Sequence, residues 1–189
     1  MTQCHELVLA SGNPHKLEEL RAALPGWQIE LLGRGGDPPP EDGDTFEANA
    51  RIKARWARLH APAAAWAVGE DSGIEAAALG GKPGVRTARW AAGDPVGRML
   101  AALESATDRR ARYVSALVAI APDGREVVAE GTLDGVVATA AAGSEGFGFD
   151  PVFVPDGETA TVATLGNDWK RMHSHRARAA ARLAERLRA

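Results

Sequence analysis

Residues 6–32 read ELVLASGNPHKLEELRAALPGWQIELL and decide the fold class. Residues 6–11 form an apolar run rich in Leu and Val, as is typical of a buried strand. Leucines then recur at helical spacing until Pro25-Gly26 stops the helix, and residues 27–32 follow as a second strand. A strand, a helix and a strand in succession predict an α/β protein.

Further helices and strands are expected in the rest of the chain. A proline-rich loop over residues 34–44 precedes a helix, for which we expect Asp44 to be the N-cap in a capping box with Glu47. The further expected elements are helix 45–59, strand 65–68, helix 96–103, hairpin strands 113–121 and 126–137, strand 151–154 and a helix from about His173 onward.

The composition is that of one soluble globular domain over residues 1–189, with 45% hydrophobic and 25% charged residues. The single cysteine, Cys4, cannot close an intrachain disulfide, so no oxidising compartment is required. No run approaches the ~20 apolar residues that span a bilayer. We therefore expect a cytoplasmic protein without membrane association.

Positive charge is concentrated at the C-terminal end, although the whole chain carries a net charge of -3. From Lys170 onward there are seven Lys or Arg residues and one Glu. This end either serves an anionic small ligand or forms a solvated helix face. With no recognition motif and an acidic remainder, nucleic-acid binding is not expected.

Two short segments have residues suited to phosphate chemistry. Residues 11–16, SGNPHK, lie between a strand and a helix, where free backbone N–H groups and a lysine favour an anion; the alternative is an ordinary surface loop. Glu70 and Asp71 follow an expected strand, and neighbouring strand residues point to opposite faces, so one of them, Asp71, should face a pocket. Asp71 could bind Mg²⁺ or orient a water, or could be a solvated turn residue.

Three further segments are candidates with equally plain alternatives. Glu41 could complete a Mg²⁺ site or be a solvated loop acid. The segment 146–151, GFGFDP, could stack on a base or pack in the core. Lys170 with His173, His175 and Arg176 would favour an anion at the start of the last helix, and the histidine spacing does not support zinc.

Five segments in order, SGNPHK, EDGDTFEANARIKA, EDSGIEAAALGGKPGVRTARW, GFGFDPVF and KRMHSHR, resemble the inosine triphosphate pyrophosphatase family, the Ham-type house-cleaning XTP/dITP hydrolases. The resemblance covers nearly the whole chain. It implies an elongated α/β fold with a central mixed β-sheet flanked by helices, two lobes that share one core with an active-site cleft between them, and a homodimer. It also implies Mg²⁺-dependent hydrolysis of aberrant purine nucleoside triphosphates (ITP, dITP, XTP) to the monophosphate and pyrophosphate.

The resemblance also assigns roles to residues. Glu41 and Asp71 would bind Mg²⁺, with Asp71 as the proton acceptor. The phosphates, the base and its 6-oxo edge would be contacted by Ser11, Gly12, Asn13, Pro14, His15, Lys16, Asn49, Lys53, Ser72, Phe147, Gly148, Phe149, Asp150, Lys170, His175 and Arg176.

Three positions depart from the commonest form of these motifs: Glu70 stands for an Asp, His173 for an apolar residue, and Phe149 for a Tyr. The Phe removes a phenol hydroxyl and its hydrogen bond. The alternative enzyme is a Maf-like pyrophosphatase of related fold, acting on modified pyrimidine or methylated guanosine triphosphates. The alternative without catalysis is a nucleic-acid-binding module built on the C-terminal arginines.

Overall fold

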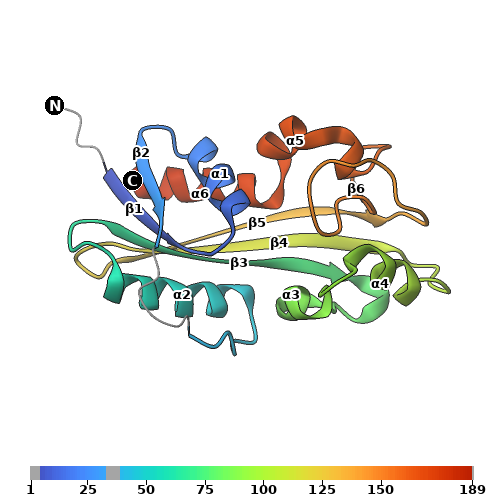
Figure 1. Ribbon diagram of the computed structural model, residues 1–189, viewed down its shortest axis with the longest axis horizontal. Helices are drawn as coiled ribbons and strands as arrows, with labels where there is room; N and C mark the ends of the chain where they lie inside the picture. Colours follow the sequence, from blue (N-terminus) through green and yellow to red (C-terminus); the bar gives the residue numbers. More distant parts are fainter. Residues whose placement is uncertain (1–4, 33–38, 189) are drawn as a thin grey trace. The chain divides into compact units, whose positions relative to one another are not determined.

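A computed structural model of the chain describes residues 5–32 and 39–188. Its centre is a six-stranded sheet in the order β2-β1-β3-β4-β5-β6, with helices packed on it (Figure 1). Strand β1 (His5–Ala10) runs parallel to β2 and β3, whereas β5 and β6 are antiparallel. The predicted mixed α/β sheet is therefore confirmed.

Further strands and helices follow along the chain. The strands are β2 (Trp27–Leu31), β3 (Trp66–Ala76), β4 (Arg110–Ile120), β5 (Glu126–Val137) and β6 (Phe153–Pro155). The α-helices are α1 (Pro14–Ala23), α2 (Phe46–His60), α3 (Thr87–Trp90), α4 (Pro95–Ala102), α5 (Val162–His173) and α6 (His175–Arg188). Short 3-10 turns, η1 (Ala77–Leu79) and η2 (Gly84–Arg86), lie between β3 and α3. No helix among the described residues has the length and apolar character needed to cross a membrane.

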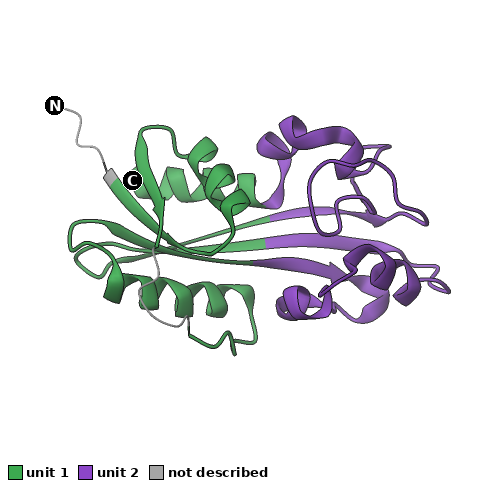
Figure 2. Ribbon diagram, viewed as in Figure 1, with its two compact units in different colours: residues 1–71, 115–131, 176–189 green, residues 72–114, 132–175 purple. Residues whose placement is uncertain are grey.

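The chain forms two compact units (Figure 2). Unit 1 comprises Met1–Asp71, Ser115–Gly131 and Arg176–Ala189, and unit 2 comprises Ser72–Val114 and Thr132–His175. The strands β3, β4 and β5 each contribute residues to both units. The elongated shape, the shared core and the cleft that the resemblance implies stay predictions.

In unit 1 the sheet is covered on both faces, by α2 on one and by α1 and α6 on the other (Figure 1). Because β1 is central and parallel, consecutive residues from Leu7 to Ala10 are all buried, as expected for a strand between two helical layers. Leu7 and Leu9 pack with Leu20 of α1 and Leu183 of α6. This core fixes the loop between β1 and α1, and with it the first candidate site segment.

Helix α2 approaches β3 very closely at Gly69. A Cβ atom there would lie 2.0 Å from the carbonyl oxygen of Ala50 and 2.5 Å from the backbone nitrogen of Ala54, and neither backbone atom can move alone. The glycine therefore sets the distance at which α2 presents Asn49 and Lys53 to the strand.

We expect Gly69→Ala to lower the free energy of unfolding by about 3 kcal/mol, because the added methyl group forces α2 away from β3. Urea denaturation followed by circular dichroism measures the change. Gly12→Ala is the control, since a Cβ there meets nothing within 4 Å. Equal stability of the two variants would contradict this account of the packing.

Unit 2 has its own core. Ile74 of β3, Leu133 of β5 and Phe153 of β6 pack with Met99 of α4, and all four side chains are at most 4% exposed. Tyr113 of β4 and Phe149 belong to the same cluster. The loop before β6 is thus held by apolar packing, which positions the second candidate site segment.

Several predicted boundaries are wrong, each for a local reason. The strand expected over residues 65–68 continues to Ala76, because the polar residues beyond it are buried and paired. The N-cap of α2 is Thr45, whose hydroxyl accepts from the N–H of Ala48, while Glu47 pairs with Arg51. The expected strand 151–154 lies at Phe153–Pro155.

The C-terminal helix expected from about His173 is confirmed as α6, which begins at His175, and a separate helix, α5, ends at His173. Lys170 and His173 therefore lie at the end of α5 and not at the start of the last helix. Helix α5 itself was not predicted, and it is interrupted by Gly166 at φ 90°, which weakens its periodicity in the sequence. Part of the predicted loop over residues 34–44 lies outside the described residues. Cys4 lies outside them as well.

Candidate active site

The loop from β1 to α1 has the form of an anion-binding helix N-terminus. Asn13 is the N-cap, and its side-chain oxygen accepts from the N–H of His15 at 3.0 Å, while Pro14 occupies the first turn. The hydroxyl of Ser11 accepts from the N–H of Asn13 at 3.1 Å. Ser11 can still donate its O–H, and Lys16 adds a positive charge one turn later. Gly12 and His15 are exposed in this loop.

Asp71 is held by two side chains of α2. The amide of Asn49 donates to Oδ2 at 3.1 Å, and the ammonium of Lys53 donates to Oδ1 at 2.8 Å. Both α2 residues are buried, and their spacing of four places them on one side of the helix, as the sequence predicts. Burial raises the pKa of the Asp71 carboxyl above its usual range, against the opposing effect of Lys53.

Glu41 reaches the same place from the loop before α2. Its Oε1 lies 3.2 Å from the Lys53 ammonium, which is also the partner of Asp71. The side-chain oxygen of Asn49 accepts from the N–H of Gly43 at 2.8 Å, so one amide ties this loop to Asp71. The Lys53 ammonium therefore contacts both carboxylates, which brings Glu41 and Asp71 to the same place.

This pair of carboxylates fits a hard divalent cation. The described residues contain no cluster of three or more His, Cys, Asp or Glu that could hold a metal. Mg²⁺, however, commonly takes one or two carboxylates and completes its shell with water and substrate phosphate. The oxygen donors of Glu41 and Asp71 satisfy that requirement.

Glu70 points the other way, as strand alternation predicts, and is 3% exposed. Its carboxylate pairs with Lys16 of α1 and with Arg176 of α6, and it accepts from the hydroxyl of Ser115 at 3.1 Å. Burial alone would raise the pKa of Glu70, but Lys16 and Arg176 hold it well below its usual range. Glu70 therefore fixes two cations beside the β1–α1 loop.

In unit 2 a second polar cluster centres on Asp150, which is 3% exposed. Its Oδ2 accepts from the Lys170 ammonium at 2.7 Å and from the N–H of Phe147 at 2.8 Å. The same ammonium lies 3.7 Å from the centre of the Phe147 ring, a cation–π distance. Gly146 permits this turn, because a Cβ there would lie 2.2 Å from Asp150 Oδ2. Phe147, Asp150 and Lys170 are thus brought together as predicted.

The members of the predicted group Lys170, His175 and Arg176 have different partners. His175 stacks on Tyr113 in unit 2, with ring centroids 4.6 Å apart and planes inclined by 9°. Arg176, the next residue, pairs with Glu70 and Glu19 in unit 1. Consecutive residues at a helix start point in different directions, and the contact of all three with the base edge stays a prediction.

The other predicted contacts differ in exposure. Phe149 is 3% exposed and packs near Trp90, with ring centroids 6.1 Å apart, so of the two earlier interpretations its place is that of a core residue. Gly148 has φ 65°, the left-handed region that favours glycine. Ser72 follows Asp71 in β3 and is partly buried.

Sequence reasoning missed Tyr113, Ser115 and Glu19, which contact predicted site residues. Tyr113 and Ser115 were included only as members of a strand. Period-two alternation could have placed them on one face of that strand, but nothing along the chain indicates which acids they meet.

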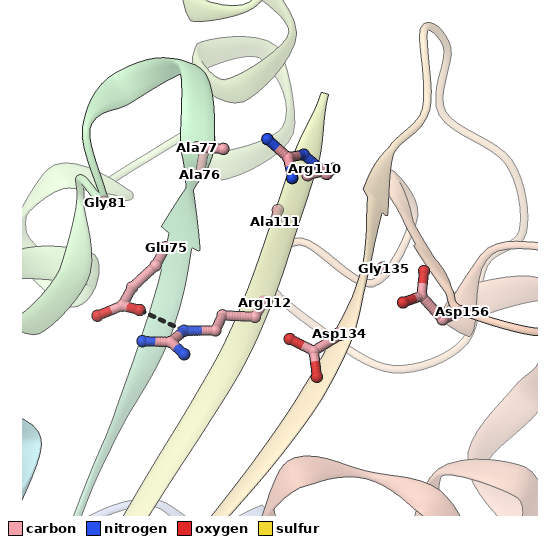
Figure 3. A pocket seen from close by; sticks show the side chains of 10 residues that line it. All are labelled: Glu75, Ala76, Ala77, Gly81, Arg110, Ala111, Arg112, Asp134, Gly135 and Asp156. Carbon is pink, nitrogen blue, oxygen red and sulfur yellow. Dashed lines mark hydrogen bonds and ion pairs between the residues drawn. The ribbon is translucent and has the colours of Figure 1, made fainter. Parts of the chain in front are cut away.

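A pocket of about 470 Å³ in unit 2 is lined by none of the predicted site residues (Figure 3). Its charged residues are Glu75, Arg110, Arg112, Asp134 and Asp156. Arg112 pairs with Glu75 at 2.6 Å, and Arg110 pairs with Asp108 at 2.7 Å. Because both cations are already neutralised beside further carboxylates, this pocket is poorly suited to a triphosphate.

Known proteins resemble the chain over almost its full length. The dITP/XTP pyrophosphatase of Symbiobacterium thermophilum is 47% identical, over 96% of this chain and 94% of the relative. The Ham1 protein of Staphylococcus aureus superposes with a TM-score of 0.85 at 32% identity, covering 97% of this chain and 98% of that chain. The nucleoside-triphosphatase / dITP/XTP pyrophosphatase of Mycobacterium abscessus gives 0.75 at 40% identity, covering 94% and 98%. A model of the Ham1 family matches residues 7–186, and the chain therefore belongs to the Ham1 family.

Proposed function

We propose that this protein hydrolyses non-canonical purine nucleoside triphosphates, namely ITP, dITP and XTP, to the monophosphate and pyrophosphate. The observation that carries the proposal is the contact of Asn49 and Lys53 with Asp71, together with the pairing of Glu41 to the same Lys53 ammonium. The names of the relatives, dITP/XTP pyrophosphatases, support the same substrates. The enzyme is thus a nucleoside triphosphate pyrophosphatase that removes aberrant nucleotides.

The two polar clusters have different tasks in this proposal. The residues of unit 1, Ser11, Asn13, Lys16 and Lys53, bind the phosphates through an N-terminal helix turn and two ammonium groups. The residues of unit 2 that bind the base are Phe147, Asp150, Lys170 and His175. The ring of Phe147 stacks on the base, the carboxylate of Asp150 accepts from its edge, and Lys170 and His175 donate to the 6-oxo atom.

Glu41 and Asp71 would hold a Mg²⁺ ion. When bound, such an ion neutralises phosphate charge and polarises the phosphorus that water attacks. Lys53, which touches both carboxylates, would shift its ammonium toward the phosphate oxygens.

Asp71 accepts the proton of the attacking water in this mechanism. The amide of Asn49 donates to Oδ2 of Asp71 and fixes the orientation of the carboxylate toward the water. Lys16 and Lys53 stabilise the charge that develops on the phosphate oxygens, which is usually the larger part of such catalysis. The bond between the α-phosphorus and the oxygen that bridges to the β-phosphorus breaks. The β- and γ-phosphates leave as pyrophosphate, and the nucleoside monophosphate is the other product.

We also propose a cytoplasmic homodimer that needs neither a membrane nor nucleic acid. The absence of an intrachain disulfide supports the location, because the single Cys4 has no second cysteine to pair with.

A panel of nucleoside triphosphates tests the substrate. Pyrophosphate release from ITP, dITP and XTP should exceed release from ATP, GTP and UTP by at least about tenfold in kcat/KM, and EDTA should abolish it. A preference for UTP or for 7-methyl-GTP would favour the Maf-like alternative. Activity that survives EDTA would contradict the metal assignment and leave the substrate assignment intact.

A further inference from the structure

Tyr113 is the only tyrosine of the chain, and it links Asp150 to His175 in unit 2. Its hydroxyl donates to Oδ1 of Asp150 at 3.3 Å, and its ring stacks almost parallel on that of His175. The tyrosine is itself fixed from another side, because Phe153 packs against its ring with centroids 4.5 Å apart. At 7% exposure it is buried behind the cluster and does not form part of its open surface.

The contacts of Asp150 explain what the hydroxyl of Tyr113 adds. Oδ2 accepts from both Lys170 and the backbone of Phe147, which accounts for its two acceptor positions. Oδ1 accepts from Tyr113 alone among the hydrogen bonds of the described residues, so one further acceptor position is left on this oxygen. The neighbouring aromatic residues Phe147 and Phe149 have no hydroxyl that could replace the phenol.

This remaining position suits one kind of purine. A 6-oxopurine has an N–H at N1 beside its oxo group, whereas adenine has a lone pair at N1 beside an amino group. A carboxylate oxygen whose direction is fixed can accept from the first and repels the second. Lys170 and the N–H of Phe147 hold Oδ2, and the Tyr113 hydroxyl adds the restraint on Oδ1, the oxygen that would accept from the base.

Resting on the proposed function, we propose that Tyr113 is a positioning residue for base selection: it orients the carboxylate of Asp150 and supports the ring of His175, and thereby sets the preference for 6-oxopurine triphosphates. It does not touch the substrate. A buried tyrosine with a purely structural role would affect stability but leave the choice between bases unchanged.

Kinetics of two variants with ITP and ATP test the proposal. Tyr113→Phe keeps the stacked ring and removes the hydroxyl; we expect KM for ITP to rise about tenfold with kcat within about twofold, and the ITP/ATP ratio of kcat/KM to fall about tenfold. Tyr113→Leu removes the stacking as well and should lower the ratio about a hundredfold. Leu103→Ala is the control, since it weakens the same core without touching the cluster, and its ratio should equal that of the wild type.

Three outcomes would overturn the inference: an unchanged ratio in both tyrosine variants, an equal loss of ratio in Leu103→Ala, or a loss confined to kcat. Each of these leaves wild-type ITP hydrolysis standing. If the wild-type enzyme releases no pyrophosphate from ITP, the proposed function fails, and the inference that rests on it fails too. Wild-type activity with ITP therefore distinguishes failure of the function from failure of the inference alone.

A spectroscopic measurement adds a readout that does not depend on turnover. With ring-¹³C tyrosine the protein gives signals from one residue, because Tyr113 is alone. Addition of IMP should shift these signals, and addition of inorganic pyrophosphate should leave them unchanged. Signals that do not respond to IMP would contradict a role for Tyr113 in base recognition.

Discussion

Asp71→Asn should lower kcat for ITP hydrolysis by about three orders of magnitude, since the amide cannot accept a proton from the attacking water. Asn has the same size and keeps an oxygen to accept from Lys53, so the local packing of α2 on β3 is retained. Lys53 also keeps Glu41 as a partner at 3.2 Å. We therefore expect the loss in turnover to come with a change of only about 1 kcal/mol in the free energy of unfolding.

Steady-state release of pyrophosphate and urea denaturation of the same preparation measure the two effects separately. Asp134→Asn is the matched control: it makes the same chemical change at an exposed acid of β5, and both turnover and stability should equal those of the wild type. Turnover of Asp71→Asn within a few fold of the wild type would remove Asp71 from the role of base.

The pH dependence of the wild type has a defined sign. A base works only when deprotonated, so kcat/KM should fall as the pH decreases through the pKa of Asp71. Burial raises that pKa in the metal-free protein, whereas a Mg²⁺ ion bound to the carboxylate would lower it. The fall should therefore move to lower pH as the Mg²⁺ concentration is raised, and a profile that does not respond to Mg²⁺ would argue against Asp71 as both base and metal ligand.

The sequence predicted the elements whose signals are local. The central run Leu7–Ala10, the leucine spacing of α1 and the β4–β5 hairpin follow from hydrophobic periodicity and turn residues, and these elements are confirmed. Helix α5 has no such signal, because Gly166 breaks its regular pattern. The predicted strand ended before Glu70 and Asp71, because two consecutive acids in a sequence are typical of solvent-exposed residues, whereas β3 continues to Ala76.

The site could be predicted in its members but not in its pairings. Spacing alone placed Asn49 and Lys53 on one side of α2, because helix geometry fixes that relation. The contact of Arg176 with Glu70 joins residues 106 positions apart, and no local rule predicts it. His175 and Arg176 have different partners because each faces different elements, and those elements are set by the packing of the whole sheet.

Glu70→Gln should cost about 3 kcal/mol of folding stability at pH 7, because it leaves the partly buried cations Lys16 and Arg176 without their shared anion. Glutamine keeps the shape of the side chain and can still accept from Ser115, so the loss reports the charge and not a cavity. The control is Glu75→Gln, which removes one partner of a half-exposed pair with Arg112 and should cost less than about 1 kcal/mol.

The effect of Glu70 on stability must also disappear in acid. The folded-state pKa of Glu70 is lowered, so its contribution is complete above the unfolded-state pKa of about 4.3 and is lost as the pH falls toward the folded-state value. The difference between wild type and Glu70→Gln should therefore be constant from pH 7 to pH 5.5 and smaller by about 1 kcal/mol at pH 3.5. Urea denaturation at each pH measures it. A difference that is the same at pH 3.5 and pH 7 would mean that the ion pairs with Lys16 and Arg176 do not stabilise the fold, and that Glu70 is held by packing alone.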